Sequence, residues 1–157
     1  MQELILVRHA EAETEAASGK DQDRVLTPHG MEEARAAGVW LAAHGVVPDH
    51  VLCSPARRAE QTARLLLKEL GSTSIPDQAE EIYNATPGEL LALLDQYGDA
   101  RAVLLIGHNP GMERLVALLV EGRSDQFRGM PPAGLAILQF SGPLEPGNAR
   151  LGAFWSP

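Results

Sequence analysis

The chain lacks the features of a membrane protein or a disulfide-rich secreted one. It has one cysteine in 157 residues, 4% aromatic residues and no apolar run near the roughly 20 residues of a membrane span. Cys53 has no second cysteine with which to form an internal disulfide. Glu3 precedes a short apolar run, which breaks the basic-then-apolar pattern of a secretion signal. We therefore expect a cytoplasmic protein.

Excess basic charge is missing as well, since the formal net charge is −8 at pH 7. Nucleic acids and anionic membranes are bound by basic surfaces, so neither is an expected partner. The sequence also has no HExxH motif, no cysteine pair and no carboxylates at ligand spacing, which predicts no metal and no other cofactor. Against this acidic background, a local cluster of arginine and histidine is conspicuous.

The apolar pattern predicts a single α/β domain over residues 1–157. A chain of this length buries about two-thirds of its unfolded surface. Strands are expected at 3–7, 50–53, 79–82 and 102–106, and helices at 28–43, 59–70, 87–97 and from 111 onward. The segments 135–140 and 150–155 flank a Gly/Pro-rich turn and predict a hairpin. The fold class is therefore a three-layer α/β/α sandwich whose mixed, mostly parallel sheet has an antiparallel edge.

Polar motifs follow three of the predicted strands directly. Arg8-His9-Ala10-Glu11 follows the first, Ser54-Pro55-Ala56-Arg57-Arg58 the second, and Gly107-His108-Asn109-Pro110 the strand at 102–106. In open α/β sheets, ligands bind beyond the carboxyl ends of the strands. Parallel strands would thus deliver two imidazoles and two guanidinium groups to one edge, a combination that suits a phosphoryl group.

His9 is the candidate nucleophile, because a neutral imidazole attacks phosphorus with the lone pair of one ring nitrogen. The other nitrogen is expected to donate its proton to a backbone carbonyl, which would fix the tautomer. Taken alone, a histidine at this place is more often a strand cap or a core residue. The adjacent Arg8 and the strand-end position favour the catalytic interpretation.

Arg8 and Arg58 are the candidate phosphate ligands, since guanidinium groups bind phosphate oxygens in pairs and stay charged. Spacing alone separates Arg58 only weakly from Arg57, for which a solvated helix face is the better interpretation. His108 is the second candidate imidazole. Gly107 before it permits close backbone approach, and Pro110-Gly111 after it starts a helix whose amides attract anions.

Glu11 and Glu13 are candidates to orient His9 or to supply a proton, although a solvated loop explains them equally well. The polar segment 11–25 is expected to be a loop near the site.

In their order and spacing, these motifs resemble the histidine phosphatase superfamily. The match rests on Arg8-His9-Ala10-Glu11, Leu26-Thr27 with Gly30, Ser54-Pro55 with Arg58-Ala59 and Gln61-Thr62-Ala63, and Gly107-His108-Asn109-Pro110. The resemblance implies a phosphoglycerate mutase-like fold and a transiently phosphorylated His9. It implies that Arg8, Arg58 and His108 hold the phosphoryl oxygens, with Asn109 beside them. It also selects Arg58 over Arg57.

Within the family, the short chain looks most like the compact SixA-type phosphohistidine phosphatases. A phosphomonoester expels an alkoxide, which benefits from a general acid, whereas protonated phosphohistidine expels neutral imidazole with a conjugate-acid pKa of roughly 6.5. Asn109 stands where the acid-phosphatase branch carries an aspartic acid. Its side chain is an amide and cannot donate a proton as an acid. Glu81, or Glu80, lies near the place of the mutase branch's glutamic acid and is the candidate general acid.

Three functions follow from these observations. The first is a metal-independent phosphatase that acts through phosphorylated His9 on a protein phosphohistidine. The second is a small-molecule phosphomonoesterase with Glu81 as its acid. The third, from another class, is a non-catalytic phosphate- or phosphopeptide-binding module. The expected partner is thus a phosphorylated protein or a small phosphorylated substrate, and the oligomeric state is not predicted.

Overall fold

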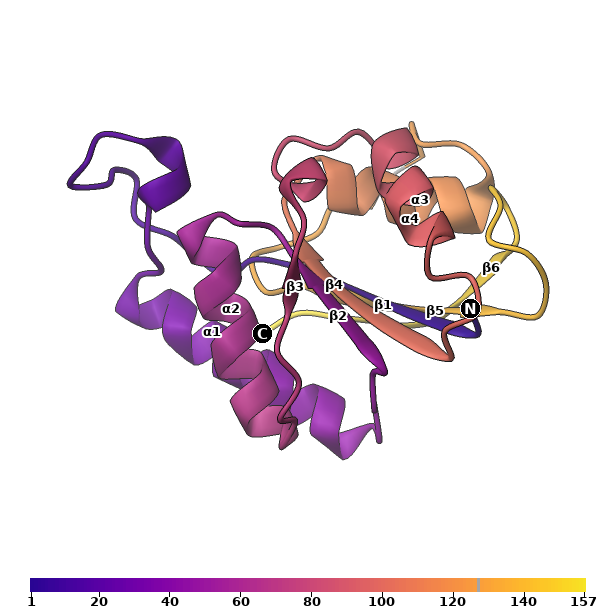
Figure 1. Ribbon diagram of the computed structural model, residues 1–157, viewed down its shortest axis with the longest axis horizontal. Coiled ribbons are helices and arrows are strands. Elements are labelled where there is room, and N and C mark those ends of the chain that lie inside the picture. Colours follow the sequence, from indigo (N-terminus) through magenta and orange to yellow (C-terminus); the bar gives the residue numbers. More distant parts are fainter. Residues whose placement is uncertain (127) are drawn as a thin grey trace.

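The computed structural model describes residues 1–126 and 128–157 as a six-stranded mixed sheet with helices on both faces (Figure 1). The strands are β1 (Glu3–Arg8), β2 (His50–Cys53), β3 (Asp77–Gln78), β4 (Ala102–Gly107), β5 (Leu135–Phe140) and β6 (Ala149–Trp155). The helices are α1 (Pro28–Ala43), α2 (Arg57–Leu70), α3 (Pro87–Asp95) and α4 (Gly111–Glu121), with short 3-10 helices η1 (Asp21–Asp23) and η2 (Glu80–Ile82). In the described part of the chain, no helix is long and apolar enough to span a membrane.

The strand order β3-β2-β4-β1-β5-β6 confirms the predicted mixed sheet. β1 pairs with β4 in parallel, and β4 pairs in parallel with β2. β5 runs antiparallel to β1 and pairs with β6 as the predicted hairpin. The carboxyl ends of β1, β2 and β4 consequently lie side by side at one edge of the sheet, as a convergent site requires.

Alternation along β1 divides the core into two layers. Leu4 and Leu6 belong to the cluster that includes α3 and α4, whereas Ile5 and Val7 belong to the cluster that includes α1 and α2. All four side chains are fully buried, as expected for a central strand covered on both faces. This burial holds the end of β1, and hence Arg8, in a fixed place.

The start of α1 follows the predicted chemistry. Thr27 is the N-cap, its hydroxyl oxygen accepts the Gly30 N–H at 2.9 Å, and Pro28 occupies the first helical position. The cap also fixes the end of the long loop that follows β1.

The predicted strand at 79–82 is wrong. β3 ends at Gln78, and Glu80–Ile82 form η2. Glu80 and Glu81 are exposed while Ile82 is buried in the core. A strand here would point one of two consecutive carboxylates toward the apolar layer under the sheet, and burying an unpaired carboxylate is costly.

Candidate active site

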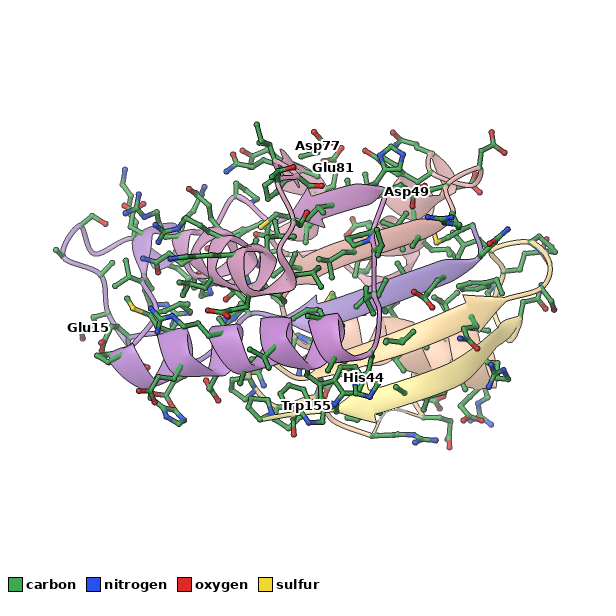
Figure 2. All side chains as sticks on the ribbon, turned by 90° about the horizontal axis from the view of Figure 1, so that it is seen from below. Glu15, His44, Asp49, Asp77, Glu81 and Trp155 are labelled. Atoms are coloured by element: carbon green, nitrogen blue, oxygen red, sulfur yellow. The ribbon has the colours of Figure 1, made fainter. Side chains whose placement is uncertain are left out.

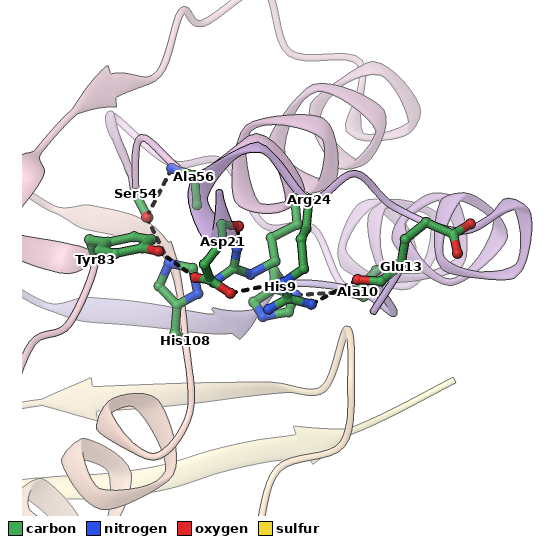
Figure 3. A network of polar contacts seen from close by, with 10 residues as sticks. His9, Ala10, Glu13, Asp21, Arg24, Ser54, Ala56, Tyr83 and His108 are labelled. Carbon is green, nitrogen blue, oxygen red and sulfur yellow. Dashed lines mark hydrogen bonds and ion pairs between the residues drawn. The ribbon is translucent and has the colours of Figure 1, made fainter. Parts of the chain in front are cut away.

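A cleft of about 580 Å³ lies beyond the carboxyl ends of β1, β2 and β4. It is lined by the four predicted residues Arg8, His9, Arg58 and His108, together with parts of the loops before α1, α3 and α4. The His9 N–H donates to the Gly107 carbonyl at 2.9 Å and so ties the two strand ends together. Figure 3 shows the resulting network of polar contacts.

His9 has the orientation that a nucleophile requires. Its Nδ1 lies 2.7 Å from the Ala10 carbonyl oxygen. Because a carbonyl only accepts, Nδ1 carries the hydrogen and Nε2 keeps a lone pair. The pKa of His9 is lowered to about 4, mainly by burial; the Arg58 and Arg8 guanidinium groups act in the same direction, and the Ala10 contact opposes them. The imidazole is therefore neutral at pH 7.

The two arginines are held by backbone carbonyls and each keeps an unused donor. Arg8 Nη1 donates to the Met130 carbonyl at 2.8 Å, and Arg58 Nη1 donates to the Asp21 carbonyl at 2.8 Å. The Nε atoms of both arginines are buried and have no hydrogen-bond partner among the described residues. Arg57, in contrast, is exposed and does not line the cleft.

His108 faces His9 across the cleft, with 5.1 Å between the ring centroids. Its Nε2 lies 2.7 Å from Ser54 Oγ, and its Nδ1 is buried with no partner in the described chain. Burial lowers the pKa of His108 to about 3, with His9 and Arg58 contributing in the same direction. The preceding Gly107 is closely packed: a Cβ there would lie 3.0 Å from Ile82 Cγ2 and from Met112 Sδ, so these side chains would have to shift by a few tenths of an ångström.

Three residues that the sequence did not single out complete the network. The Asp21 carboxylate accepts from the Tyr83 hydroxyl, from Arg24 Nε at 2.9 Å and from Arg58 Nη2 at 3.1 Å. The Tyr83 hydrogen bond is the main reason that the pKa of Asp21 is lowered and, reciprocally, that the pKa of Tyr83 is raised. The Tyr83 ring also meets His108 edge-on, with 5.6 Å between centroids. Asp21 and Arg24 belong to the predicted loop near the site, but spacing gives no signal for their contacts.

Asn109 lines the cleft and connects its floor to the loop before β5. Its Nδ2 donates to the Met130 carbonyl at 2.9 Å, the same carbonyl that accepts from Arg8, and to Glu113 Oε2 at 3.3 Å. Asn109 thereby helps to hold the acceptor that orients Arg8.

Glu81 lies outside the cleft. It is exposed and lines a neighbouring hollow together with Glu80 and Glu89; Figure 2 shows it near Asp77, on the β3 side of the molecule. Among the described residues that line the cleft, Glu11 is the one with a carboxyl group. Its Oε1 accepts a hydrogen bond from the Thr27 hydroxyl at 2.8 Å. The Glu13 side chain is exposed, and its backbone carbonyl accepts from Arg24. This placement does not support Glu81 as a proton donor.

The described residues near the cleft offer neither a reactive thiol nor a cluster of metal ligands. Cys53, at the end of β2, is buried, and burial raises the pKa of its thiol to about 12. Within the described ranges, no group of three or more His, Cys, Asp or Glu side chains is placed to hold a metal ion. The groups at hand are thus two neutral imidazoles and two guanidinium forks, which suit attack on a bound phosphoryl group.

Comparisons with known proteins agree with this geometry. The model of the histidine phosphatase superfamily (branch 1) matches residues 4–84. The phosphohistidine phosphatase SixA of Escherichia coli K12 is 36% identical over 129 residues, covering 78% of this chain and 76% of SixA. An uncharacterized protein of Mycobacterium tuberculosis is 36% identical over 151 residues, covering 87% of this chain and 91% of its own. A solved structure of the protein histidine phosphatase SixA complexed with tungstate superposes with a TM-score of 0.85 at 30% identity, covering 99% and 97% of the two chains.

Proposed function

The chain belongs to the histidine phosphatase superfamily and is a SixA-like phosphatase, and from this premise we propose that it hydrolyses phosphohistidine on other proteins through a phosphorylated His9. The observation that carries the proposal is a set of buried nitrogens around the cleft that holds His9. Arg8 Nε, Arg58 Nε and His108 Nδ1 have no hydrogen-bond partner among the residues that the structure describes. Each unsatisfied buried donor costs about 1–3 kcal/mol. An anion that accepts from all of them removes that cost, and tungstate in the SixA structure is such a tetrahedral oxyanion.

In the first step, the lone pair of His9 Nε2 attacks phosphorus. A P–N bond forms to His9 while the P–N bond to the substrate imidazole breaks, and the electron pair leaves with that imidazole. When the other ring nitrogen of the substrate is already protonated, the leaving group is a neutral imidazole and no proton has to move. Arg8 and Arg58 neutralise the charge on the equatorial oxygens during the transfer.

In the second step, water attacks the phosphorus of phospho-His9. A P–O bond forms, the bond between phosphorus and Nε2 breaks, and His9 regains its lone pair. Both hydrogens of the water leave with the product as dihydrogen phosphate. The Nδ1–H contact with the Ala10 carbonyl holds the ring in place through both steps.

The acid–base inventory of the cleft supports a phosphohistidine rather than an alkyl phosphate as substrate. An alkoxide leaving group benefits from a general acid, worth about 10²–10⁴-fold. Asn109 is not an acid, and Glu81 lies outside the cleft. Glu11 is engaged by Thr27, and the Tyr83 hydroxyl donates its hydrogen to Asp21. A neutral imidazole leaves without such help.

The direct test is to trap the phosphoenzyme. We expect wild-type protein, quenched at alkaline pH during turnover of a phosphohistidine-bearing protein, to carry one phosphoryl group on His9 by mass spectrometry. His9→Ala should carry none and should lose turnover by at least about 10⁴-fold, as when a nucleophile is removed. Turnover without a phosphoenzyme, or undiminished turnover by His9→Ala, would contradict the mechanism.

A matched pair of variants tests the alternative, a small-molecule phosphomonoesterase. Glu11→Gln and Glu81→Gln each remove one carboxyl group, one inside the cleft and one outside it. We expect wild type to prefer the phosphohistidine protein over alkyl phosphates, and Glu81→Gln to match wild type on both. Equal or better turnover of the esters, with a loss of 10²-fold or more in either variant, would favour the phosphomonoesterase.

A further inference from the structure

The two nitrogens of the His108 ring have different surroundings. Nε2 lies 2.7 Å from Ser54 Oγ, whereas Nδ1 is buried without a partner among the described residues. Figure 3 shows one ring nitrogen turned toward Ser54 and the other toward the centre of the site, where Asp21 and His9 lie. Which nitrogen carries the hydrogen decides what His108 offers to a ligand.

The hydrogen-bond balance of Ser54 settles that choice. Ser54 is fully buried at the end of β2, and its Oγ accepts the Ala56 N–H at 3.3 Å. Its own hydrogen needs an acceptor, and in the described structure His108 Nε2 is the acceptor within reach. If Nε2 carried the hydrogen instead, the buried Ser54 O–H would lose its acceptor, at a cost of about 1–3 kcal/mol.

We propose that Ser54 is a positioning residue that donates to His108 Nε2 and thereby fixes the Nδ1–H tautomer, so that a neutral imidazole donates its hydrogen bond to a phosphoryl oxygen. This inference rests on the proposed function for its last step, the presence of a phosphoryl group. The relay runs from the Ala56 N–H through the Ser54 hydroxyl to the His108 ring and ends at Nδ1–H.

The relay gives the two imidazoles complementary tasks. Both rings carry their hydrogen on Nδ1, but they turn opposite ends toward the ligand. His9 binds the Ala10 carbonyl through Nδ1–H and presents a lone pair, whereas His108 presents Nδ1–H and binds Ser54 through its lone pair. The lowered pKa of His108 keeps its ring neutral at pH 7. The Nδ1–H donor is therefore present without protonation of the ring. No proton leaves His108 in either step.

Nitrogen NMR of the protein without substrate tests the tautomer directly. We expect His108 Nδ1 to show the one-bond coupling to hydrogen and Nε2 to lack it. In Ser54→Ala the ring should become a mixture of both tautomers. Thr62→Val is the matched control, because Thr62 is also a fully buried hydroxyl but bonds to the Arg58 carbonyl and the Ala10 N–H instead of an imidazole. A hydrogen on Nε2 in wild type, or an unchanged tautomer in Ser54→Ala, would overturn the proposal.

A double-mutant cycle tests whether Ser54 acts through His108. Ser54→Ala should lower kcat/KM for a phosphohistidine protein by about 10- to 100-fold. This is the range typical of losing a hydrogen bond that orients a ligand-binding side chain. His108→Asn keeps an amide N–H donor near the Nδ1 position, and an amide has no second tautomer for Ser54 to select. In the His108→Asn background, Ser54→Ala should therefore change kcat/KM by less than about threefold. Equal losses in both backgrounds would indicate a purely structural role.

The two experiments separate this inference from the proposed function. A wild-type spectrum with hydrogen on Nδ1, in a protein that turns over no phosphohistidine substrate, contradicts the function and leaves the tautomer in place. An active phosphatase with hydrogen on Nε2 contradicts the role of Ser54 alone.

Discussion

The cleft has two walls of different construction. On one wall, the ends of β1 and β4 present Arg8, His9 and His108, which are held by the Met130 carbonyl, the Ala10 carbonyl and buried Ser54. On the other wall, the loop with η1 presents Arg24, and Asp21 of the same loop binds Arg24 and Arg58 through ionic contacts near the surface.

The contrast is sharpest in the ion pair between Arg58 and Asp21. The Arg58 side chain is 6% exposed and that of Asp21 is 55% exposed. Buried, backbone-held groups keep their geometry before a ligand arrives, whereas exposed ion pairs contribute about 0–1 kcal/mol. We therefore expect the strand wall to carry the chemistry and the loop wall to adjust how Arg58 is presented.

The largest effect should come from the buried side of this contrast. Arg58→Lys removes the planar fork and its buried Nε, and we expect kcat/KM to fall by about 10²–10³-fold. Arg57→Lys is the matched control on the neighbouring, exposed residue and should stay within about twofold of wild type. Steady-state kinetics with a phosphohistidine protein measures both variants. Equal losses of kcat/KM would contradict the distinction between the buried and the exposed arginine.

A smaller effect is expected from the loop wall. Asp21→Asn removes the charge of the exposed partner but keeps an oxygen acceptor and the backbone carbonyl that accepts from Arg58 Nη1. Because an ion pair with a solvent-exposed partner contributes about 0–1 kcal/mol, we expect kcat/KM to change by at most about fivefold. Asp23→Asn, whose carboxylate accepts only from the Ser18 hydroxyl among the described contacts, is the control. A loss as large as that of Arg58→Lys would place Asp21 with the strand wall.

The smallest change is expected on mild acidification. Because the pKa values of His9 and His108 are lowered to about 4 and about 3, both rings should stay neutral from pH 7 to pH 5, where an ordinary histidine titrates. Ring-proton NMR, with His9→Gln and His108→Gln to assign the signals, measures this. Titration of either ring near pH 6.5 would mean that burial is less complete than the structure indicates.

The same shift makes a prediction about stability, with a definite sign. Between about pH 6.5 and pH 4 the unfolded chain binds protons at these two histidines and the folded chain does not. Stability should consequently fall as the pH falls through this window. His9→Gln should show a shallower decline than wild type in urea melts, and an equal slope would contradict the assignment.

The two walls also differ in how far the sequence could predict them. The positions of Arg8, His9 and His108 follow from buried parallel strands, because the carboxyl ends of such strands meet at one edge. Asp21 and Tyr83 could not be placed, since their contacts depend on the path of a loop and on the turn after β3 rather than on any periodic pattern. The same turn moved Glu81 away from the cleft, because Ile82, and not the neighbouring glutamates, is the residue that the core accepts.

The buried thiol of Cys53 has a consequence for the conditions under which the protein works. Oxidants attack the thiolate, and a cysteine whose pKa is raised to about 12 is almost wholly in the unreactive thiol form at neutral pH. In the proposed mechanism an imidazole carries the phosphoryl group, and the one sulfhydryl is shielded inside the sheet. We therefore expect turnover to persist at peroxide concentrations that oxidise an exposed, low-pKa cysteine.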